Sequence, residues 1–231
     1  MEPIFVKTNN YAQFAEICDE LGSDSGRVGP SLALIWGRAG RGKSEAARYY
    51  AVNRGAVYVR TLPIMTPLAV LREVAFDLVA EKPHTTARCL EIIQRELRSK
   101  RRVILIDEAD LLRMDVLETL RGVNEIAGAP VVLIGEEQLA GRVASRRRIV
   151  SRIRLRQEFG PLVQPDIAVF FKHAMHLELQ PDCVAELYRL SGGDWRPMLK
   201  GAIDLERSMR ASGAKAVSLQ LVKAILGNNQ P

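Results

Sequence analysis

The sequence predicts an α/β fold in which a five-stranded parallel sheet is flanked by helices and followed by a small, all-helical segment. Three observations support this prediction. Short, wholly apolar runs alternate with helical patterns over the first two thirds of the 231 residues, which indicates strands buried on both faces of a sheet. One of these runs leads through a glycine-rich turn into a helix. Beyond residue 160 the patterns are helical only.

The composition is that of a folded protein without membrane segments. Apolar residues make up 47% of the chain, and its length suits one large domain or one domain with a small appendage. The three cysteines are far apart and show no CxxC spacing, which is typical of reduced, structural cysteines. The N-terminus lacks a signal pattern, and no apolar run approaches the roughly 20 residues of a membrane span. We therefore expect a soluble cytoplasmic protein with no membrane partner.

Residues 1–29 are expected to form a lead-in helix and a loop. Apolar residues at positions 11, 14, 17, 18 and 21 repeat with the period of a helix. Asn9 or Asn10 can cap this helix, and the segment from Gly22 to Pro30 has the composition of a loop. The α/β core is thus expected to begin at residue 30.

A phosphate-binding loop follows the first apolar run, 31–36. Its residues are Gly37, Arg38, Ala39, Gly40, Arg41, Gly42, Lys43 and Ser44, which fit the pattern of Gly, four free residues and Gly-Lys-Ser/Thr. Such a loop turns several backbone N–H groups toward a triphosphate at the N-terminus of a helix. We expect Lys43 to lie against the β- and γ-phosphates and Ser44 to bind Mg²⁺. The residues from Gly37 to Glu45 are all expected to contact the nucleotide. The alternative is a glycine-rich turn without a ligand.

A second candidate site lies at the end of the apolar run 103–106, which continues into Asp107 and Glu108. An acid at this position can hold the Mg²⁺ shell, and we assign that role to Asp107. Glu108 is placed to polarise an attacking water. The alternative is a strand end with two solvated acids. The strand–helix segment 55–100 between the two motifs is typical of P-loop ATPases that have an extra strand and a catalytic glutamate.

The remaining elements of the core follow from their patterns. Strands are predicted at 56–60 and 130–135, and helices at 68–79, 87–98 and 116–126. A polar residue after the fourth strand often senses the γ-phosphate, but Gly135 and Glu136 occupy that region here. The sensing role is therefore left unassigned.

Seven arginines gather after the fourth strand. The net charge of +6 matters only where it is clustered, and no acidic residue lies between Gln138 and Gln157. The arginines of this segment are Arg142, Arg146, Arg147, Arg148, Arg152, Arg154 and Arg156. Three interpretations stay open: contacts to DNA phosphates, an arginine finger that reaches a neighbouring subunit's ATP, and a solvated basic face. The alternation over 151–155 predicts a short fifth strand with Arg152 and Arg154 on one side.

The segment after Gly160-Pro161 predicts helices at 167–177, 181–190, 197–210 and 218–226. Arg196 opens the third of them, within the sequence Gly-Gly-Asp-Trp-Arg. A lone arginine is usually a surface residue, but from this position Arg196 could reach a γ-phosphate.

These motifs together resemble the AAA+ ATPases over residues 30–226. The resemblance implies an AAA+ α/β ATPase core over 30–160 and a helical lid subdomain over 161–231. It also implies that Arg196 is the second sensor and that Arg152 is the arginine finger acting in trans. Arg146, Arg147 and Arg148 are reserves for the finger.

Within this class the chain resembles the family of DNA transposition protein B of Mu-like transposable phages. The resemblance rests on the stretches 56–59, 71–75, 106–110 and 131–136 and on the Thr-Pro loop between the first two. It implies Mg²⁺- and ATP-dependent assembly as a ring or helical filament on double-stranded DNA, capture of target DNA and stimulation of a transposase in a bacterial host cell. Hydrolysis would drive disassembly. Because the first core strand begins at residue 31, we expect no additional N-terminal helix-turn-helix domain of the kind the phage protein carries.

The DNA-facing candidates are Thr66, Lys100, Arg101, Arg102, Arg146, Arg147 and Arg148. Two other functions compete with this one. The first is an AAA+ helicase loader or replication initiator that acts on a protein partner, and the second is a P-loop phosphotransferase for a small molecule. Stimulation of phosphate release by DNA or by a metabolite separates the phosphotransferase from the others, and transposase stimulation separates the remaining two.

Overall fold

The computed structural model describes residues 1–23, 28–214 and 216–227, and it divides into two compact units. The α/β unit comprises residues 10–38 and 43–159. The helical unit comprises residues 1–9, residues 39–42 and the chain from Gly160 onward. Part of the loop expected between Gly22 and Pro30 lies outside the described residues.

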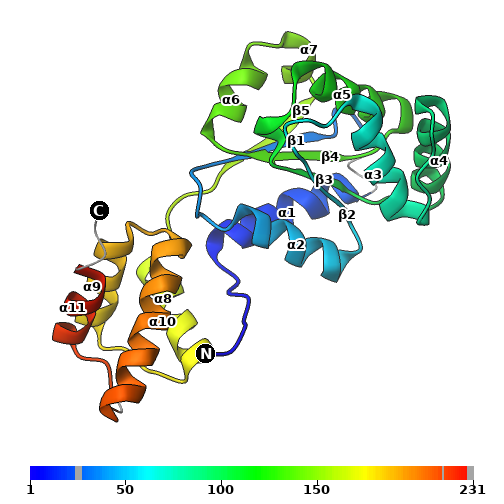
Figure 1. Ribbon diagram of the computed structural model, residues 1–231. Coiled ribbons are helices and arrows are strands. Elements are labelled where there is room, and N and C mark those ends of the chain that lie inside the picture. Colours follow the sequence, from blue (N-terminus) through cyan, green and yellow to red (C-terminus); the bar gives the residue numbers. More distant parts are fainter. Residues whose placement is uncertain (24–27, 215, 228–231) are drawn as a thin grey trace. The chain divides into compact units, whose positions relative to one another are not determined.

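The α/β unit is built on a five-stranded sheet in which every pairing is parallel. The strands are β1 (Leu32–Trp36), β2 (Val57–Arg60), β3 (Ile104–Asp107), β4 (Val131–Gly135) and β5 (Ile153–Glu158). Their order across the sheet is β2-β3-β4-β1-β5 (Figure 1). The predicted fold class is confirmed.

Alternate residues of the central strands enter two different apolar cores. Leu32 and Leu34 of β1 lie in the core on one face of the sheet, and Ala33 and Ile35 lie in the core on the other. Because strand side chains alternate between faces, a wholly apolar run is the pattern of a strand that is covered on both sides.

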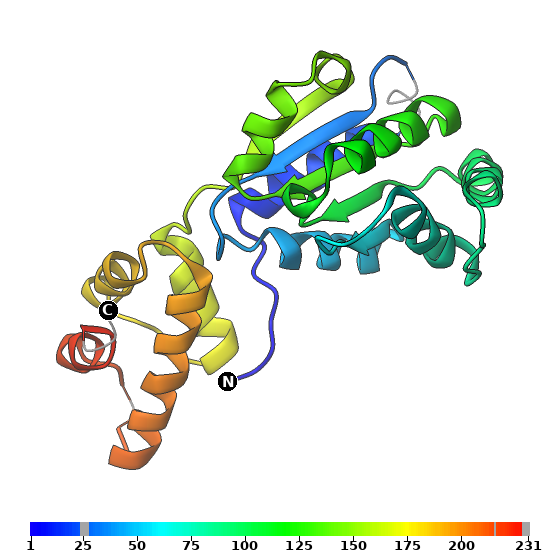
Figure 2. The ribbon, with the colours of Figure 1, turned by 45° about the horizontal axis from the view of Figure 1, so that its top comes forward.

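Helices cover both faces of this sheet (Figures 1 and 2). Buried residues of α1 (Asn9–Gly22) and α2 (Lys43–Arg54) belong to one core. The helices that contribute to the other core are α3 (Pro67–Val79), α4 (Thr86–Ser99), α5 (Met114–Ala127), α6 (Glu137–Ala144) and α7 (Arg147–Val150). A short 3₁₀ helix, η2 (Ala109–Leu111), follows β3.

The fifth strand begins later than predicted. Residues 147–150 form α7, and the Arg152 N–H donates to the Ile149 carbonyl at 2.9 Å, so Ser151 and Arg152 belong to the end of that helix. The strand proper starts at Ile153, and Arg154 and Arg156 are its exposed arginines. Arg152 and Arg154 therefore do not share one face of a strand.

The lead-in of the chain is shared between the two units. Phe14, Cys18 and Leu21 of α1 are fully buried in the α/β unit, where Phe14 packs edge-on against Tyr50 with ring centroids 5.8 Å apart. Residues 1–9 belong to the helical unit instead, with Val6 in its core. Residues 1–29 are thus not a separate unit in this division.

The helical unit has its own apolar core. Its helices are α8 (Gln164–Met175), α9 (Pro181–Ser191), α10 (Trp195–Ser212) and α11 (Leu219–Gly227), drawn in yellow to red in Figure 2. Phe171, Leu187 and Leu205 are fully buried among them. Within the described part of the chain, no helix has the length and apolar character needed to traverse a lipid bilayer.

Candidate functional site

The candidate site is built at the carboxyl end of the sheet. β1 and β3 are both neighbours of β4, and all three run parallel, so the segments that follow β1 and β3 leave the sheet at the same edge. The phosphate-loop pattern follows β1 directly, and Asp107 ends β3. The fold therefore brings the two predicted motifs to one edge.

The phosphate loop starts at a glycine that no other residue could replace without movement. A Cβ atom on Gly37, at φ 152°, would lie 2.6 Å from the carbonyl oxygen of Phe159. Phe159 is fixed there because its N–H donates to the Trp36 carbonyl at 2.7 Å. Close approach of two backbone segments thus explains the first glycine of the pattern.

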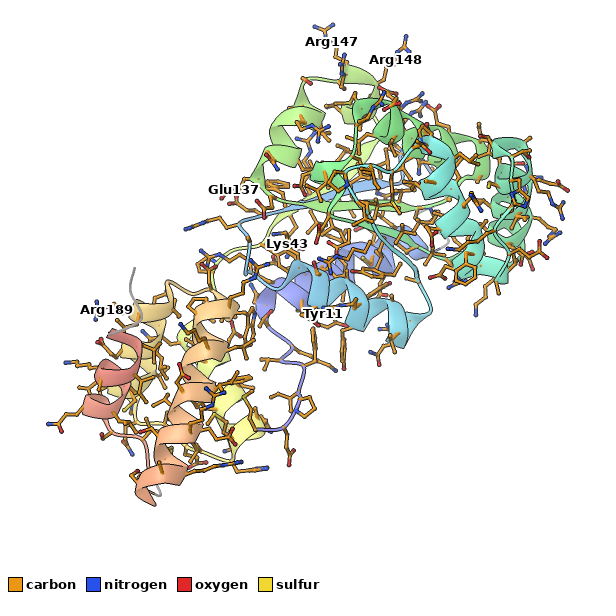
Figure 3. The ribbon with its side chains drawn as sticks, viewed as in Figure 1. Tyr11, Lys43, Glu137, Arg147, Arg148 and Arg189 are labelled. Carbon is orange, nitrogen blue, oxygen red and sulfur yellow. The ribbon has the colours of Figure 1, made fainter. Side chains whose placement is uncertain are left out.

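Lys43, the first residue of α2, is hydrogen-bonded to the first residues of the phosphate loop (Figure 3). Its ammonium donates to the carbonyl oxygens of Gly37 at 2.5 Å and Arg38 at 2.9 Å, and only 9% of the residue is exposed. Ser44 follows it and is half-buried. Glu45 points elsewhere: its carboxylate pairs with Arg48 on the exposed side of α2.

Asp107 is 1% exposed, and both its carboxylate oxygens have donors. Oδ2 accepts from the Tyr58 hydroxyl at 2.7 Å, and Oδ1 accepts from the Glu108 N–H at 3.0 Å. Burial, and then the bond to Asp107, raises the pKa of Tyr58, so its phenol stays a donor at neutral pH. Both donors are neutral groups, and carboxylate oxygens are ligands that suit a hard cation.

Glu108 has a left-handed backbone, at φ 56° and ψ 35°, which is rare for a residue other than glycine. Its carboxylate pairs with Arg60, with Oε1 at 2.5 Å from Nη2 and 3.0 Å from Nε. The Thr61 hydroxyl lies 2.8 Å and 2.9 Å from the carbonyl oxygens of Asp107 and Glu108. Strained backbone held by such neighbours is typical of functional sites.

Tyr58 and Arg60 were not among the residues predicted from the sequence. Both belong to β2, which pairs with β3 so that Arg60 stands opposite Asp107. The pairing of β2 with β3 is the signal that could have found them. Polar residues at the end of a strand that neighbours the acid-bearing strand are expected to lie beside those acids.

The residues after β4 form a separate, closed polar cluster. Asp110 accepts from the Glu136 N–H and the Gln138 side-chain amide, each at 3.0 Å. A Cβ atom on Gly135 would lie 2.5 Å from the Asp110 carboxylate, which explains the glycine at the strand end. The Arg142 guanidinium donates to the carbonyl oxygens of Asp110 and Leu112. Arg142 is thereby committed to the internal structure of the unit.

Arg152 lies at the amino end of the parallel strands, opposite the end that carries the phosphate loop. Its carbonyl accepts from the N–H of Leu32, the first residue of β1, whereas the phosphate loop follows the last residue of that five-residue strand. The separation is roughly 16 Å at 3.3 Å per residue. Arg152 lines a polar hollow of about 430 Å³ and pairs with Glu125 at 2.6 Å. A role at the nucleotide of its own subunit is excluded by this position.

The three consecutive arginines before β5 are exposed. In the described residues no side-chain partner exists for Arg146, Arg147 or Arg148. Figure 3 shows Arg147 and Arg148 projecting from α7 away from the ribbon. These cations are available to an external ligand.

The other DNA-facing candidates have internal roles. The Arg101 guanidinium donates to the carbonyl oxygens of Leu21 and Gly128, and that of Arg102 donates to Gly55 and pairs with Asp77 at 2.9 Å. The Thr66 hydroxyl accepts from the Ala69 N–H at 3.3 Å as the N-cap of α3. Thr66 and Lys100 are exposed, and Arg101 and Arg102 are half-buried. The DNA-facing role of Arg101 and Arg102 stays a prediction, but each guanidinium already binds groups of the protein.

Two predicted residues belong to the helical unit. Arg196, in the first turn of α10, is exposed and has no side-chain partner within the described ranges. Arg41 is only 8% exposed, and its Nε lies 3.0 Å from the Asp194 carboxylate. Arg41 was predicted to contact nucleotide, but its guanidinium is occupied by protein groups.

Comparison with known proteins agrees with this architecture. A protein-family model described as an AAA domain matches residues 26–143, more than half of the chain. The chain belongs to the AAA domain family. The predicted AAA+ ATPase class is confirmed.

Two named proteins of Mu-like phages are similar to part of the chain. The chain is 32% identical over 128 residues to the ATP-dependent target DNA activator B of Escherichia phage Mu, a match that covers 54% of this chain and 41% of that protein. It is 27% identical over 144 residues to the Mu-like prophage FluMu DNA transposition protein B of Haemophilus influenzae, covering 61% and 48%. The chain thus spans less than half the length of these relatives. The predicted resemblance to the Mu-like transposition proteins is confirmed.

Solved structures share the fold at low sequence identity. Cdc6p of Pyrobaculum aerophilum has a TM-score of 0.70 at 18% identity, covering 94% of this chain and 66% of that one. The Aeropyrum pernix ORC1 protein in complex with DNA has a TM-score of 0.66 at 20% identity, covering 99% and 66%. The Thermotoga maritima RuvB branch migration motor has a TM-score of 0.65 at 18% identity, covering 95% and 68%. These likenesses concern the fold alone.

Proposed function

We propose that this AAA+ protein hydrolyses ATP with Mg²⁺, assembles as a ring or helical filament on double-stranded DNA without sequence preference, and delivers that DNA to a transposase. The observation that carries the proposal is the meeting of the Lys43 loop and the Asp107-Glu108 pair at one edge of the sheet. Similarity to a phage target DNA activator supports the choice of DNA and transposase as partners.

Nucleotide binding is assigned to the loop from Gly37 to Ser44. The Lys43 ammonium, which donates to two loop carbonyls, would exchange them for β- and γ-phosphate oxygens. Ser44 and Asp107 would hold Mg²⁺, and the buried, acceptor-rich carboxylate of Asp107 fits a hard cation. The ion supplies charge neutralisation at the phosphates.

Hydrolysis is assigned to Glu108 as the residue that orients and polarises the attacking water. Because its carboxylate is paired with Arg60, that pair must open before Glu108 reaches a water. Arg60 therefore slows hydrolysis in the unassembled chain, because it keeps Glu108 paired.

Assembly is assigned to Arg152. Its place at the amino edge of the sheet suits an arginine that stabilises transition-state charge at a neighbouring subunit's nucleotide. The Glu125 partner would then be exchanged for phosphate. Arg196 is proposed as the second sensor of the γ-phosphate, which its exposure permits.

DNA binding is assigned first to Arg146, Arg147 and Arg148. Unpartnered arginines neutralise DNA phosphates and release counterions, which gives affinity without base readout. Arg101 and Arg102 rank after them as candidates, because their guanidinium groups already bind carbonyl oxygens and Asp77.

Steady-state phosphate release with and without duplex DNA tests the proposal. We expect release to be stimulated by duplexes of unrelated sequence and to be abolished in Lys43→Ala and Glu108→Gln. Glu108→Gln should still bind nucleotide. Stimulation by a protein partner or a metabolite in place of DNA would contradict the proposal and favour a loader or a phosphotransferase.

A further inference from the structure

The middle of the phosphate loop is packed as part of the helical unit. Residues 39–42 belong to that unit, and Arg41 is 8% exposed within it. The Arg41 Nη1 donates to the Gly193 carbonyl at 2.8 Å and to the Gly192 carbonyl at 3.3 Å, and its Nε pairs with Asp194 at 3.0 Å. One guanidinium thus binds three consecutive residues of the turn between α9 and α10.

That turn is shaped to receive the arginine. Gly192, at φ 59°, ends α9, and Gly193, at φ 70°, continues in the left-handed region. A Cβ atom on Gly193 would lie 2.6 Å from the Pro161 Cβ and 3.1 Å from the Arg41 Nη1. The Gly193 carbonyl also accepts from the Leu162 N–H at 2.9 Å. The turn therefore has little freedom to place the Arg41 acceptors elsewhere.

Two backbone features extend the contact to the residues on either side of Arg41. The Trp195 N–H donates to the Gly40 carbonyl at 2.9 Å. Gly42, the second glycine of the loop pattern, has φ 90°, and a Cβ atom on it would lie 3.1 Å from the Trp195 indole, so both the backbone and this ring favour glycine. The indole in turn packs edge-on against Phe170, with centroids 5.8 Å apart.

The two arginines of the loop differ in a way that separates their roles. Arg38 is exposed and has no side-chain partner among the described residues, so its charge is free to meet an anion. Arg41 has a carboxylate and two carbonyl oxygens as partners and is nearly buried. A guanidinium in such a site has a structural role, because its planar set of donors fixes the geometry of the groups that they bind.

We propose that Arg41 is a positioning residue that fastens the phosphate loop to the 192–195 turn and thereby couples nucleotide binding to the start of α10. This inference rests on the proposed function. The loop keeps its nucleotide-binding shape only while the turn is in place, and nucleotide in the loop stabilises the turn in return, since such coupling is reciprocal. Arg196, which follows the turn, is held in register with the loop by the same contact.

The test compares Arg41→Ala, Arg41→Lys and Asp194→Asn with Arg207→Ala as the control, which removes an exposed ion pair with Asp204 on α10 of the same unit. The measurements are the dissociation constant for a fluorescent ADP and amide hydrogen exchange of residues 190–196 with and without saturating nucleotide. We expect Arg41→Ala to weaken nucleotide binding by about tenfold or more, because it removes hydrogen bonds of a charged group. Arg41→Lys, which keeps the charge and loses the fork, should be intermediate, and Asp194→Asn milder.

The exchange measurement separates coupling from mere stability. In wild type and Arg207→Ala, saturating nucleotide should slow exchange in the turn, whereas in Arg41→Ala it should not, even when the loop is fully occupied. If Arg41→Ala fails to fold, Asp194→Asn carries the same comparison. Equal affinity and equal protection in the Arg41 and Arg207 variants would overturn the coupling alone. Wild type that binds no nucleotide would overturn the proposed function and the coupling with it.

Discussion

Tyr58 and Arg60, two residues apart on β2, each hold one of the two acids that end β3. The half-buried phenol of Tyr58 donates to Asp107, which is 1% exposed, and the exposed guanidinium of Arg60 pairs with Glu108. A hydrogen bond to a buried carboxylate holds its orientation, whereas an exposed ion pair is weak and opens readily. The acid assigned to the metal is therefore rigid, and the acid assigned to water is switchable.

Arg60→Ala should raise basal phosphate release in the absence of DNA by up to about fivefold. The reason is that an exposed ion pair is weak, so only a small free energy is needed to release Glu108. Arg88→Ala, which removes an equally exposed pair with Glu91 on α4, is the control and should leave the rate unchanged. A fall in rate for Arg60→Ala would show that Arg60 assists hydrolysis.

Tyr58 should also make stability fall at alkaline pH. Its pKa in the folded protein is raised above the ordinary value by burial and by Asp107, so the fold favours the protonated phenol. The stabilisation is complete below about pH 10, where the unfolded phenol ionises, and it is lost as pH rises further. Urea unfolding between pH 8 and pH 11 should show a shallower loss in Tyr58→Phe than in wild type. Tyr188→Phe, which removes a phenol from the helical unit, is the control and should follow wild type. Parallel curves for all three proteins would contradict this role.

At the scale of elements, the arginines of the segment from α6 to β5 differ in whether their side chains have partners. Arg142 is tied to η2 and its flank, Arg152 to α5 and Arg154 to α1. Among the described residues, the arginines of α7, its N-cap Arg146 and Arg156 of β5 have no side-chain partner. One run of charge in the sequence thus separates into arginines with internal partners and arginines without them.

The double variant Arg147→Ala/Arg148→Ala should weaken binding to duplex DNA uniformly across sequences. Each lost phosphate contact lowers the slope of log affinity against log salt by about 0.9, so the slope should fall by about 1.8. Arg88→Ala/Arg95→Ala removes the same charge from ion pairs on α4 and is the control. An unchanged slope in the α7 variant would place the DNA elsewhere.

The elements with a single physical interpretation were predictable from the sequence. The sequence patterns predicted β1 to β4 within one residue at each end. For β1, β3 and β4 the reason is that a wholly apolar run fits a strand covered on both faces. The fifth strand was misplaced because its alternating arginines extend into α7.

Much of the site could not be found in this way because it depends on tertiary neighbours. The loop pattern fixes its glycines and Lys43 but leaves the Arg41 position free, so the pairing with Asp194, 153 residues later, leaves no local signal. Arg101 and Arg102 look like a surface charge run until the carbonyl oxygens that they bind are seen. Tyr58 and Arg60 become visible only through the β2–β3 register.

At the scale of the whole molecule, the proposed active site is incomplete within one subunit. Lys43 and Glu108 lie toward the carboxyl edge of the sheet, and Arg152 lies at the amino edge. A complete site therefore needs two subunits in head-to-tail contact, which generates rings or open helices.

Mixing inactive variants tests this arrangement. Arg152→Ala alone should retain nucleotide binding and lose DNA-stimulated hydrolysis by roughly 10³-fold. A mixture of Lys43→Ala and Arg152→Ala should recover part of the rate, because a neighbour with Arg152 can complete a site with Lys43. The mixture of Lys43→Ala with Glu108→Gln is the control and should recover nothing. Absence of recovery in the first mixture would contradict a finger that acts in trans.

The central claim is that nucleotide binding at the Lys43 loop drives assembly on DNA. Negative-stain electron microscopy of the chain with long duplex DNA, with ATP or a slowly hydrolysed analogue, tests it most directly. The account predicts rings or filaments on DNA in the presence of nucleotide and none with Lys43→Ala. Bare DNA with wild-type protein under both nucleotides would contradict it.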